Sequence, residues 1–591
     1  MTVSFDVWAP LCRRVRLVAD TGEGPSEPVD LERDADDWWR LPAPVAARLG
    51  DDADYGYLLD GDENPVPDPR SRFQPHGVHG LSRAVDPDLF NWTDRQWTGR
   101  QLAGGVIYEL HVGTFTAEGT LDAAIGRLDH LVELGIDFVE VMPVNAFNGE
   151  HGWGYDGVGW YAVHHAYGGP RAYQRFVDAC HARGLAVIQD VVYNHFGPSG
   201  NYAPRFGPYL DDSLSSPWGA GVNLSGPGSD PVRRFIIDNA LMWLRDYHVD
   251  GLRLDAVHAL VDTRAVHLLE ELADEVEALS AFERRPLSLV AESDQNDPRL
   301  ITSRDGGGYG LTAQWSDDFH HALVTNLTGD ATGYYADFAG LGALAKVLEE
   351  GFFHNGTHSS FRGRRHGRRL DTATIPASRL VVCSDNHDQI GNRADGARLS
   401  TRLGVPQLRI AAALTLLNGS TPMVFMGQEW AASTPWAFFS SHPEPELGAA
   451  ITEGRLREFA GMAWDHAQVP DPQDPETFER SKLRWSEIDG GDHAELWRTY
   501  RDLIELRRRY LDLVDPRFDH TSTRYSEDDH WLVLERGRGM ALVVNFGAAR
   551  VEVPMDAAVE PVYAIGTASC TGGDAPTVRL GGHSAAVVRV G

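Results

Sequence analysis

Residues 251–260 read GLRLDAVHAL, and this short segment carries the pattern that identifies the fold. It has the apolar character of a buried strand, yet it contains Arg253, Asp255 and His258. Ionised groups are almost never fully buried unless they are paired or take part in chemistry. Because strand side chains alternate between two faces, Arg253 and Asp255 share one face and the leucines occupy the other. We therefore expect a strand whose charged face points into a functional site.

Seven other apolar runs resemble this one, and each is followed by an amphipathic, helix-like segment such as LDAAIGRLDHLVELG. Alternation of two-sided apolar strands with helices is typical of a parallel sheet. Eight repeats over nearly 400 residues predict a (β/α)8 TIM barrel with long inserted loops. The runs are VIYELHVGTF (106–115), DFVEVMPV (137–144), LAVIQDVVYNH (185–195), DGLRLDAVH (250–258), SLVAESD (288–294), TAQWSDDF (312–319), RLVVCSDNHD (379–388) and PMVFMGQEW (422–430).

A doubly wound open sheet is the alternative arrangement of such runs. It normally carries a glycine-rich phosphate loop after its first strand, and none follows VIYELHVGTF. Short β-like runs without helical periodicity flank the barrel region on both sides. We expect an N-terminal, immunoglobulin-like β-sandwich over residues 1–92, a catalytic barrel over 93–510 and a C-terminal β-sandwich over 511–591.

Composition excludes several classes of function. The chain has 591 residues and a net charge of -32, which disfavours general affinity for nucleic acid or anionic membranes. Its four cysteines lie far apart without CxxC spacing, so neither a zinc site nor a disulfide framework is expected. The sequence contains no signal-peptide pattern and no apolar stretch approaching the roughly 20 residues that span a bilayer. We expect a soluble, cytoplasmic protein.

Acidic side chains recur at the ends of the predicted strands, where barrel active sites are built. Asp255, Glu292 and Asp388 each follow an apolar run. Carboxylates that converge on one apolar-walled mouth repel unless their protonation states differ. One protonated and one ionised carboxyl group suit glycoside cleavage, in which an acid protonates the leaving oxygen and a carboxylate attacks the anomeric carbon. Each strand taken alone also fits a buried structural ion pair.

DVVYNH, GLRLDAVH, VAESD and SDNHD, in this order, resemble the four signature segments of the α-amylase superfamily of retaining glycoside hydrolases. The resemblance implies that Asp255 is the nucleophile, Glu292 the general acid/base and Asp388 the third carboxylate that holds sugar hydroxyls. Retention requires the first two carboxyl groups to lie about 5 to 5.5 Å apart.

The same resemblance implies residues that contact the first sugar. Arg253 orients the nucleophile, His195 and His387 donate hydrogen bonds, and His258 lies near the substrate. In the aromatic segment 152–170, Trp153 and Tyr155 are expected to stack on a sugar ring, whereas Trp160 and Tyr161 are expected to pack the loop.

Finer features, including AESDQNDPRLI, QWSDDFHHAL and DNHDQIGNR, resemble the maltooligosyltrehalose trehalohydrolases. This implies cleavage of the α-1,4 bond next to the trehalose end of maltooligosyl trehalose, with trehalose and maltooligosaccharide as products and a functional link to a maltooligosyltrehalose synthase. A charged helix start is the alternative explanation for the two aspartates after QWS. The side chains implied to read trehalose hydroxyls are Asp317, Asp318, His320, His321, Gln389 and Asn392.

No cofactor or metal is expected. Calcium needs six to eight oxygen ligands, which the neighbourhood of Asn194 does not supply, so Asn194 is interpreted as a structural hydrogen-bonding residue. The basic run FRGRRHGRRLD (361–371) is interpreted as a solvated loop near the cleft and not as a nucleic-acid site.

Two alternatives remain open at this point. A glycogen branching enzyme shares the chemistry but transfers the glucan to a 6-hydroxyl instead of water. A barrel that has lost catalysis and only binds glucan or a partner is the second alternative, and the presence of all three carboxylates disfavours it.

Overall fold

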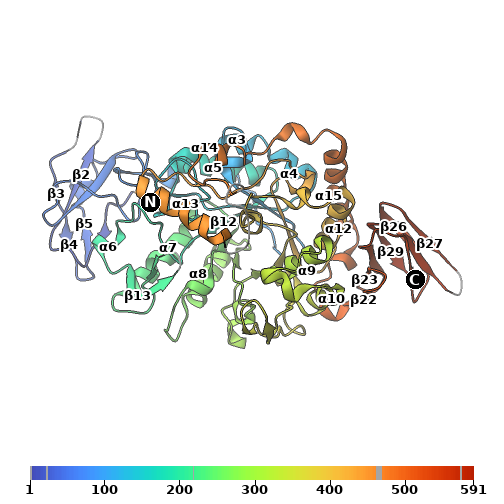
Figure 1. Ribbon diagram of the computed structural model, residues 1–591. Coiled ribbons are helices and arrows are strands. Elements are labelled where there is room, and N and C mark those ends of the chain that lie inside the picture. The colour runs from blue at the N-terminus through green and yellow to red at the C-terminus, as the bar shows by residue number, and fades with distance from the viewer. Residues whose placement is uncertain (1–2, 21–23, 25, 217–218, 461–468, 573–574) are drawn as a thin grey trace.

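The computed structural model describes residues 3–20, 24, 26–216, 219–460, 469–572 and 575–591. Figure 1 shows an elongated molecule with the N-terminal sheets at one end, a barrel with its helices in the middle and the C-terminal sheets at the other end. The domain limits at 92/93 and 510/511 remain predictions.

The central element is a closed barrel of eight strands, and all neighbouring strands are parallel. Every one of the eight predicted apolar runs contains one barrel strand, so the predicted fold class is confirmed and the open sheet is excluded. In chain order the strands are β8 (Ile107–Leu110), β9 (Phe138–Val141), β12 (Ala186–Val191), β15 (Gly251–Leu254), β16 (Ser288–Ala291), β17 (Ala313–Trp315), β20 (Leu380–Val382) and β21 (Thr421–Phe425).

Alternation of side chains along the strands explains why the barrel is closed and filled. Inward-pointing side chains near the amino ends of the strands, among them Ile107, Phe138 and Val290, form one apolar cluster. Outward-pointing neighbours such as Leu252 belong to a second cluster that continues into the surrounding helices. Both faces of each strand are therefore buried, which is why the strands read as continuous apolar runs.

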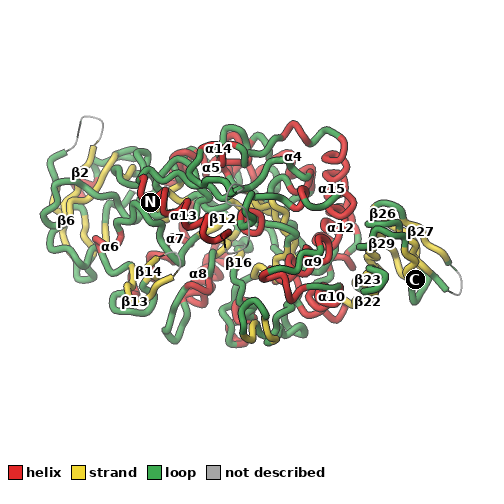
Figure 2. Tube along the Cα trace, viewed as in Figure 1, coloured by secondary structure: helices red, strands yellow, loops and turns green. Residues whose placement is uncertain are grey.

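Helices surround the barrel, as Figure 2 shows in red around the yellow strands. Among the helices in the described ranges, none combines the length and apolar character that crossing a bilayer requires. The main helices are α3 (Leu121–Ile125), α4 (Leu128–Leu134), α5 (Gly169–Ala182), α7 (Ser229–Asp246), α8 (Leu268–Glu283), α9 (Asp317–Thr328), α10 (Leu341–Glu350), α12 (Val405–Leu416) and α15 (Gly491–Arg509).

The N-terminal part consists of two β-sheets and short helices such as α1 (Ala43–Ala46), and ion pairs attach it to the barrel. Arg70 donates to Asp238, and Arg72 donates to the buried Asp246; both aspartates lie on α7. One sheet contains β1 (Val7–Trp8), β5 (Trp38–Arg40) and β4 (Glu32–Arg33), and the other contains β3 (Val29–Asp30), β2 (Val15–Asp20), β6 (Asp54–Leu59) and β7 (Ser82–Arg83).

The C-terminal part consists of two sheets that enclose their own apolar cluster. It contacts the barrel at the start of α10, where the Glu527 carboxylate accepts hydrogen bonds from the backbone N–H groups of Leu341 and Gly342. The strands in spatial order are β22 (Thr521–Ser526), β23 (Trp531–Arg536), β24 (Met540–Asn545), β29 (Ser584–Val590) and β26 (Val559–Ile565), and in the second sheet β25 (Val551–Pro554), β28 (Thr577–Leu580) and β27 (Ala568–Thr571).

A buried ionic cluster lies at the amino end of the barrel, opposite the end where an active site is expected. The Asp250 carboxylate contacts His181 Nε2 at 3.0 Å and accepts bonds from Arg285 Nη1 at 2.9 Å and Trp97 Nε1 at 2.8 Å. The backbone N–H of Val187, on β12, also donates to it at 2.9 Å. Burial acts to raise the pKa of Asp250, but His181 and Arg285 outweigh burial and lower it.

We predict that Asp250→Ala lowers the free energy of unfolding by about 3 to 5 kcal/mol, because it leaves the Arg285 charge buried without its partner. Thermal and urea unfolding followed by circular dichroism measure this. The matched control is Asp129→Ala, which removes an ion pair with Arg183 at an 84% exposed carboxylate and should cost no more than about 1 kcal/mol. Equal losses for the two variants would contradict the prediction.

Candidate active site

Along each of two strands, the side chains that point into the barrel change from apolar to charged over two residues, toward the carboxyl end. Two residues after an inward-pointing apolar side chain comes an acid: Glu109 follows Ile107 in this way, and Asp190 follows Ile188. In the strand register, Asp190 lies opposite Arg253. The carboxyl end of the barrel is therefore a ring of ionisable groups on an apolar floor, the arrangement in which protonation states are most strongly shifted.

Arg253 on β15 is the cation at the centre of this ring and is 2% exposed. Its Nη1 donates to both carboxylate oxygens of Asp190 at 2.9 Å and to Asp255 Oδ1 at 2.7 Å. Its Nη2 lies 3.8 Å from Glu292 Oε2, and its guanidinium stacks over the Trp315 ring. Burial acts to lower the pKa of Arg253, but Asp190 and the other acids around it hold that pKa well above its usual value.

Asp255 follows directly after β15, and hydrogen bonds fix both of its carboxylate oxygens. Oδ1 accepts from Arg253, and Oδ2 accepts from Asn194 Nδ2 at 2.8 Å. The same amide donates to the Asp255 carbonyl oxygen at 3.0 Å. The side chain remains 14% exposed. Asp255 thus reaches the barrel mouth in one orientation and is accessible to a ligand.

Glu292 follows β16 and lies against the backbone turn after Asp255. Its Oε2 accepts from the Ala256 N–H at 2.6 Å, and Ala256 has a left-handed backbone with φ +41°. Such a conformation is costly for a residue other than glycine and is concentrated at functional sites. Burial, opposed by Arg253 and reinforced by Asp255, raises the pKa of Glu292 to about 8. Glu292 is therefore protonated near neutral pH.

Asp388 lies in the first turn of α11 (His387–Gly391), at the outer edge of the site. Asn386 caps this helix through hydrogen bonds to the backbone N–H groups of Asp388 and Gln389. Asn392 Nδ2 donates to Asp388 Oδ1 at 2.9 Å. Asp388 is exposed, so it can contact a ligand in the mouth.

The chain matches the family model described as "Alpha amylase, catalytic domain" over residues 84–206 and a domain of unknown function over residues 516–587. It is 60% identical to the malto-oligosyltrehalose trehalohydrolase of Rhizobium sp. (strain M-11), an alignment covering 92% of this chain and 90% of the relative. It is 57% identical to the malto-oligosyltrehalose trehalohydrolase of Arthrobacter ramosus over the full length of both.

This chain belongs to the maltooligosyltrehalose trehalohydrolase family. Among solved structures, it is similar to a putative alpha amylase from Salmonella typhimurium, with a TM-score of 0.89, 36% identity and coverage of 99% of this chain and 97% of that one.

The trehalohydrolase barrel also orients a histidine–tyrosine pair above Arg253. His387 Nδ1 lies 2.5 Å from Glu109 Oε1, and its Nε2 lies 3.0 Å from the Tyr155 hydroxyl. That hydroxyl donates to Asp190 Oδ2 at 2.7 Å. Burial acts to lower the pKa of His387, but Glu109 outweighs it and raises that pKa. The residues form one chain of hydrogen bonds from β8 to Arg253.

Sequence reasoning assigned no role to Glu109 or to the side chain of Asp190. The sequence offered one indication of these residues. Each is a single acid within an apolar run, at a position whose side chain points to the same face of the strand as the predicted site residues. Glu140 is such an acid too, but neither of its carboxyl oxygens has a hydrogen-bond partner among the described residues. Burial raises the pKa of Glu140 well above its usual value, which favours the neutral form of this acid. A single acid within an apolar run therefore indicates a side chain that points into the barrel. It does not show whether that side chain contacts a ligand or serves the structure.

Two further histidines lie near Asp255 in this site. His195 Nδ1 contacts Asn194 Oδ1 at 2.5 Å, and its Nε2 contacts the Tyr155 carbonyl oxygen at 3.0 Å. Burial lowers the pKa of His195. His258 is half-buried, and within the described ranges no hydrogen-bond partner reaches its Nδ1.

Asp317 and Gln389 come together from two different strand ends. Gln389 Nε2 donates to Asp317 Oδ1 at 3.1 Å. Burial, together with Asp388, raises the pKa of Asp317 to about 7. Asp317 is also the first residue of α9, so the helix-start explanation and a role in the site are compatible.

Asp318 and His320 are buried more deeply than Asp317, whereas His321 is half-buried like Asp317. Asp318 Oδ2 accepts hydrogen bonds from Asn296 and from the backbone N–H groups of residues 353 and 354. His320 is fully buried, with Nδ1 at 2.6 Å from the Ser384 carbonyl oxygen and Nε2 at 2.9 Å from a tyrosine hydroxyl. His321 is half-buried among aromatic rings. The hydrogen bonds of Asp318 and His320 stabilise the loops behind the site.

Aromatic residues of segment 152–170 divide into two groups. The Tyr155 ring stacks on His387 with ring centroids 5.3 Å apart and contributes its hydroxyl to the site. Trp153 is 8% exposed, stacks on Trp436 and donates through Nε1 to a backbone carbonyl group, so it supports the site from behind. Trp160 is buried and stacks on Phe196 as a packing residue.

The basic run (361–371) is not simply a loop: it contributes the second strand of a short hairpin, in which β19 (Arg364–His366) pairs with the preceding β18 (Thr357–Ser359). Arg362 pairs with the Asp294 carboxylate at 2.6 Å, and His366 Nε2 contacts the Asp294 carbonyl oxygen at 2.8 Å. The hairpin is therefore tied to the segment that follows Glu292.

We predict that Asp255→Asn lowers the pKa of Glu292, because the Asp255 charge helps to raise it. Glu292 should titrate at least about one pH unit lower in the variant. The measurement is a pH series of infrared difference spectra, with the carboxylic-acid band assigned by its loss in Glu292→Gln.

The matched control for this titration is Asp129→Asn, an equivalent change at an exposed acid outside the site. Its Glu292 band should titrate as in the parent protein. A Glu292 pKa that is unchanged or higher in Asp255→Asn would contradict the electrostatic origin of the shift.

Proposed function

We propose that this chain hydrolyses the α-1,4-glucosidic bond next to the trehalose end of maltooligosyl trehalose and releases trehalose with retention of configuration. Names of full-length relatives at 57 and 60% identity support the substrate. The observation that carries the chemistry is that Arg253 lies between two carboxyl groups in different environments. Asp255 is hydrogen-bonded through both oxygens, whereas Glu292 holds a proton near neutral pH.

In the first step Glu292 gives its proton to the glycosidic oxygen while Asp255 attacks the anomeric carbon. The C1–O bond breaks, trehalose leaves with the transferred proton, and a covalent glucosyl–Asp255 ester forms. The ionised Glu292 then takes a proton from a water molecule, whose oxygen attacks the same carbon and releases Asp255. Two inversions at one centre restore the α configuration.

Arg253 and Asn194 position the nucleophile in this mechanism. Each holds one oxygen of Asp255, so the attacking lone pair is oriented before substrate binds. The strong hydrogen bonds of Arg253 to Asp190 keep the guanidinium fixed during the reaction. Asp190 and Arg253 act through Asp255 and are positioning residues.

Sugar recognition is assigned to polar groups around the mouth. Asp388 is exposed and suited to accept hydrogen bonds from sugar hydroxyls, and the Asp317–Gln389 pair offers donors and acceptors in one place. Tyr155, His195, His258 and His387 are assigned to the first sugar, and Asn392 supports Asp388. We assign His321 to the outer wall of the trehalose subsite and Asp318 and His320 to positioning of that wall.

The substrate itself implies a preceding reaction. Its reducing end has already been converted into a trehalose unit, so an enzyme that rearranges the terminal α-1,4 bond of a glucan into an α,α-1,1 bond must supply it. A functional link to such a synthase is part of this proposal.

Product analysis with two substrates of five glucose units tests the proposal. We expect rapid, near-exclusive release of trehalose from maltotriosyl trehalose and little cleavage of maltopentaose. Comparable cleavage of both substrates would indicate a general amylase, and branched or lengthened products would indicate a branching enzyme. The absence of reaction with either would favour a glucan-binding module.

We predict that Asp255→Asn lowers kcat for trehalose release at least about a thousandfold, because the covalent ester no longer forms. The exposed control Asp305→Asn should retain parent activity. Activity that survives in Asp255→Asn would refute the assignment of the nucleophile.

The pH profile of kcat/KM should fall on the alkaline side at about pH 8, because the protonated form of Glu292 is required and its pKa lies at about 8. Above that pH the rate should fall about tenfold for each pH unit. In Glu292→Gln this alkaline limb should disappear together with most of the activity. An alkaline limb near pH 5 in the parent protein would exclude Glu292 as the acid.

A further inference from the structure

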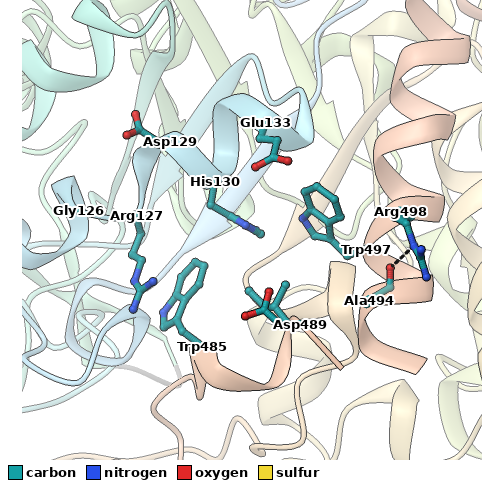
Figure 3. Close-up of a pocket in the computed structure, with 11 residues that line it drawn as sticks. Gly126, Arg127, Asp129, His130, Glu133, Trp485, Asp489, Ala494, Trp497 and Arg498 are labelled. Carbon is teal, nitrogen blue, oxygen red and sulfur yellow. Dashed lines mark hydrogen bonds between the residues drawn. The ribbon is translucent and has the colours of Figure 1, made fainter. Parts of the chain in front are cut away.

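A cavity of about 530 Å³ lies outside the active site, between α4, the first half of α15 and the short helix η11 (Trp485–Glu487). Figure 3 shows Trp485 and Trp497 on opposite walls, with the His130 ring between them. The volume falls within the range of about 300 to 1,000 Å³ typical of small-ligand sites. The reaction proposed above uses no residue of this cavity.

Two residues that line the cavity contact segments at the carboxyl end of the barrel: Trp485 contacts Phe115, after β8, and His130 contacts Glu429, after β21. Arg508, near the end of α15, donates to the Gly135 carbonyl oxygen at 2.7 Å and to Asp137 at 3.0 Å, just before β9 begins. The ends of both helices therefore lie at the amino ends of the strands. The cavity is lined by α4 along its length, from Asp129 to Glu133, and by the first half of α15.

Hydrogen bonds to the protein hold Trp485 and His130 in place before any ligand binds. Trp485 Nε1 donates to the Phe115 carbonyl oxygen at 2.7 Å, and the Phe115 ring contacts the indole edge-on. His130 Nε2 lies 2.9 Å from the carboxylate of Glu429, a fully buried residue that also accepts from Tyr108 on β8. Both indoles are only partly buried. Rigid, partly exposed indoles lower the entropy cost of binding a flat ligand surface.

The polar lining offers both donors and acceptors. Glu133 and Asp489 are exposed carboxylates on this lining, and neither forms a hydrogen bond or ion pair with the described part of the chain. Arg127 lies over the Trp485 ring, with its guanidinium carbon 4.5 Å from the ring centroid. Arg498 adds a second cation, bonded through Nε to the Ala494 carbonyl oxygen.

This combination selects a class of ligand. The carboxylates of the lining repel an anionic ligand. An apolar ligand would remove water from these unpaired charges and offer no hydrogen bonds in exchange. A neutral sugar presents C–H faces to the indoles and paired hydroxyl groups to the carboxylates and guanidinium groups. We propose that the cavity binds one or two glucose units of an α-glucan chain, as a second site beside the active site. The glucan identity rests on the proposed function.

Binding here would hold the distal part of a long substrate near the barrel mouth. Occupation of one site makes binding at the other intramolecular, which raises the effective substrate concentration at the catalytic residues. Long-chain substrates should therefore gain from the cavity, whereas substrates too short to reach both sites should not.

Isothermal titration of the full chain with maltotriose tests the proposal, with Glu292→Gln as the non-hydrolysing parent. Maltotriose is shorter than the short substrate of the kinetic test, so that one molecule occupies one site. We expect two binding sites in the parent and one after adding Trp497→Ala. Asp489→Ala, a change at an exposed carboxylate, should weaken the second site at least about fivefold. Trp92→Ala removes a partly buried indole that stacks on His248 outside the cavity, and it should keep both sites.

In the active enzyme, Trp497→Ala should lower the ratio of kcat/KM for a ten-glucose substrate to kcat/KM for maltotriosyl trehalose by about fivefold. One site in both parent and Trp497→Ala would overturn the proposal, as would loss of the second site in Trp92→Ala. A parent with a single site that Trp497→Ala removes would support this cavity while contradicting the glucan-binding mouth, so failure of the two proposals is distinguishable.

Discussion

The guanidinium of Arg253 is the interaction on which the candidate site depends. It is buried inside the barrel, donates to Asp190 and Asp255, and lies 3.8 Å from Glu292. Its positive charge favours the ionised forms of the carboxyl groups around it, in a poorly solvated interior where burial favours the neutral forms. Below these charged groups, the barrel interior is a floor of apolar side chains. This floor excludes water and so strengthens each of these interactions. The Arg253 cation is therefore both a buried structural group at the strand end and a part of the proposed chemistry.

Support for this arrangement extends through a second layer of buried polar residues. Glu109 on β8 holds His387, which contacts Tyr155, whose hydroxyl donates to Asp190. These contacts join strands on opposite sides of the barrel, so the closed sheet itself sets the distances between groups that are remote in sequence. The left-handed turn at Ala256 has a similar effect locally, because it directs a backbone N–H toward Glu292. Strain and burial are concentrated where the chemistry is proposed to occur.

The cavity between α4 and α15 differs from the barrel mouth in its physical character. The mouth is lined by buried, mutually bonded ionisable groups that shift each other's pKa. The cavity has open carboxylates beside two indoles, which suits reversible binding and not bond cleavage. A glucan that contacts both would be held by many weak interactions at one place and cleaved at another.

Sequence alone predicted the eight barrel strands and placed Asp255, Glu292 and Asp388 at strand ends, because side-chain alternation and strand-end position are local properties. It also indicated the resemblance that the full-length relatives confirm. Only the tertiary structure distinguished Asp317, which meets Gln389, from Asp318 and His320, whose hydrogen bonds serve the protein. It alone brought Glu109 to His387 and Trp485 toward Trp497. Adjacent residues of one helix point in different directions, and contacts between distant segments depend on barrel closure, which no local pattern encodes.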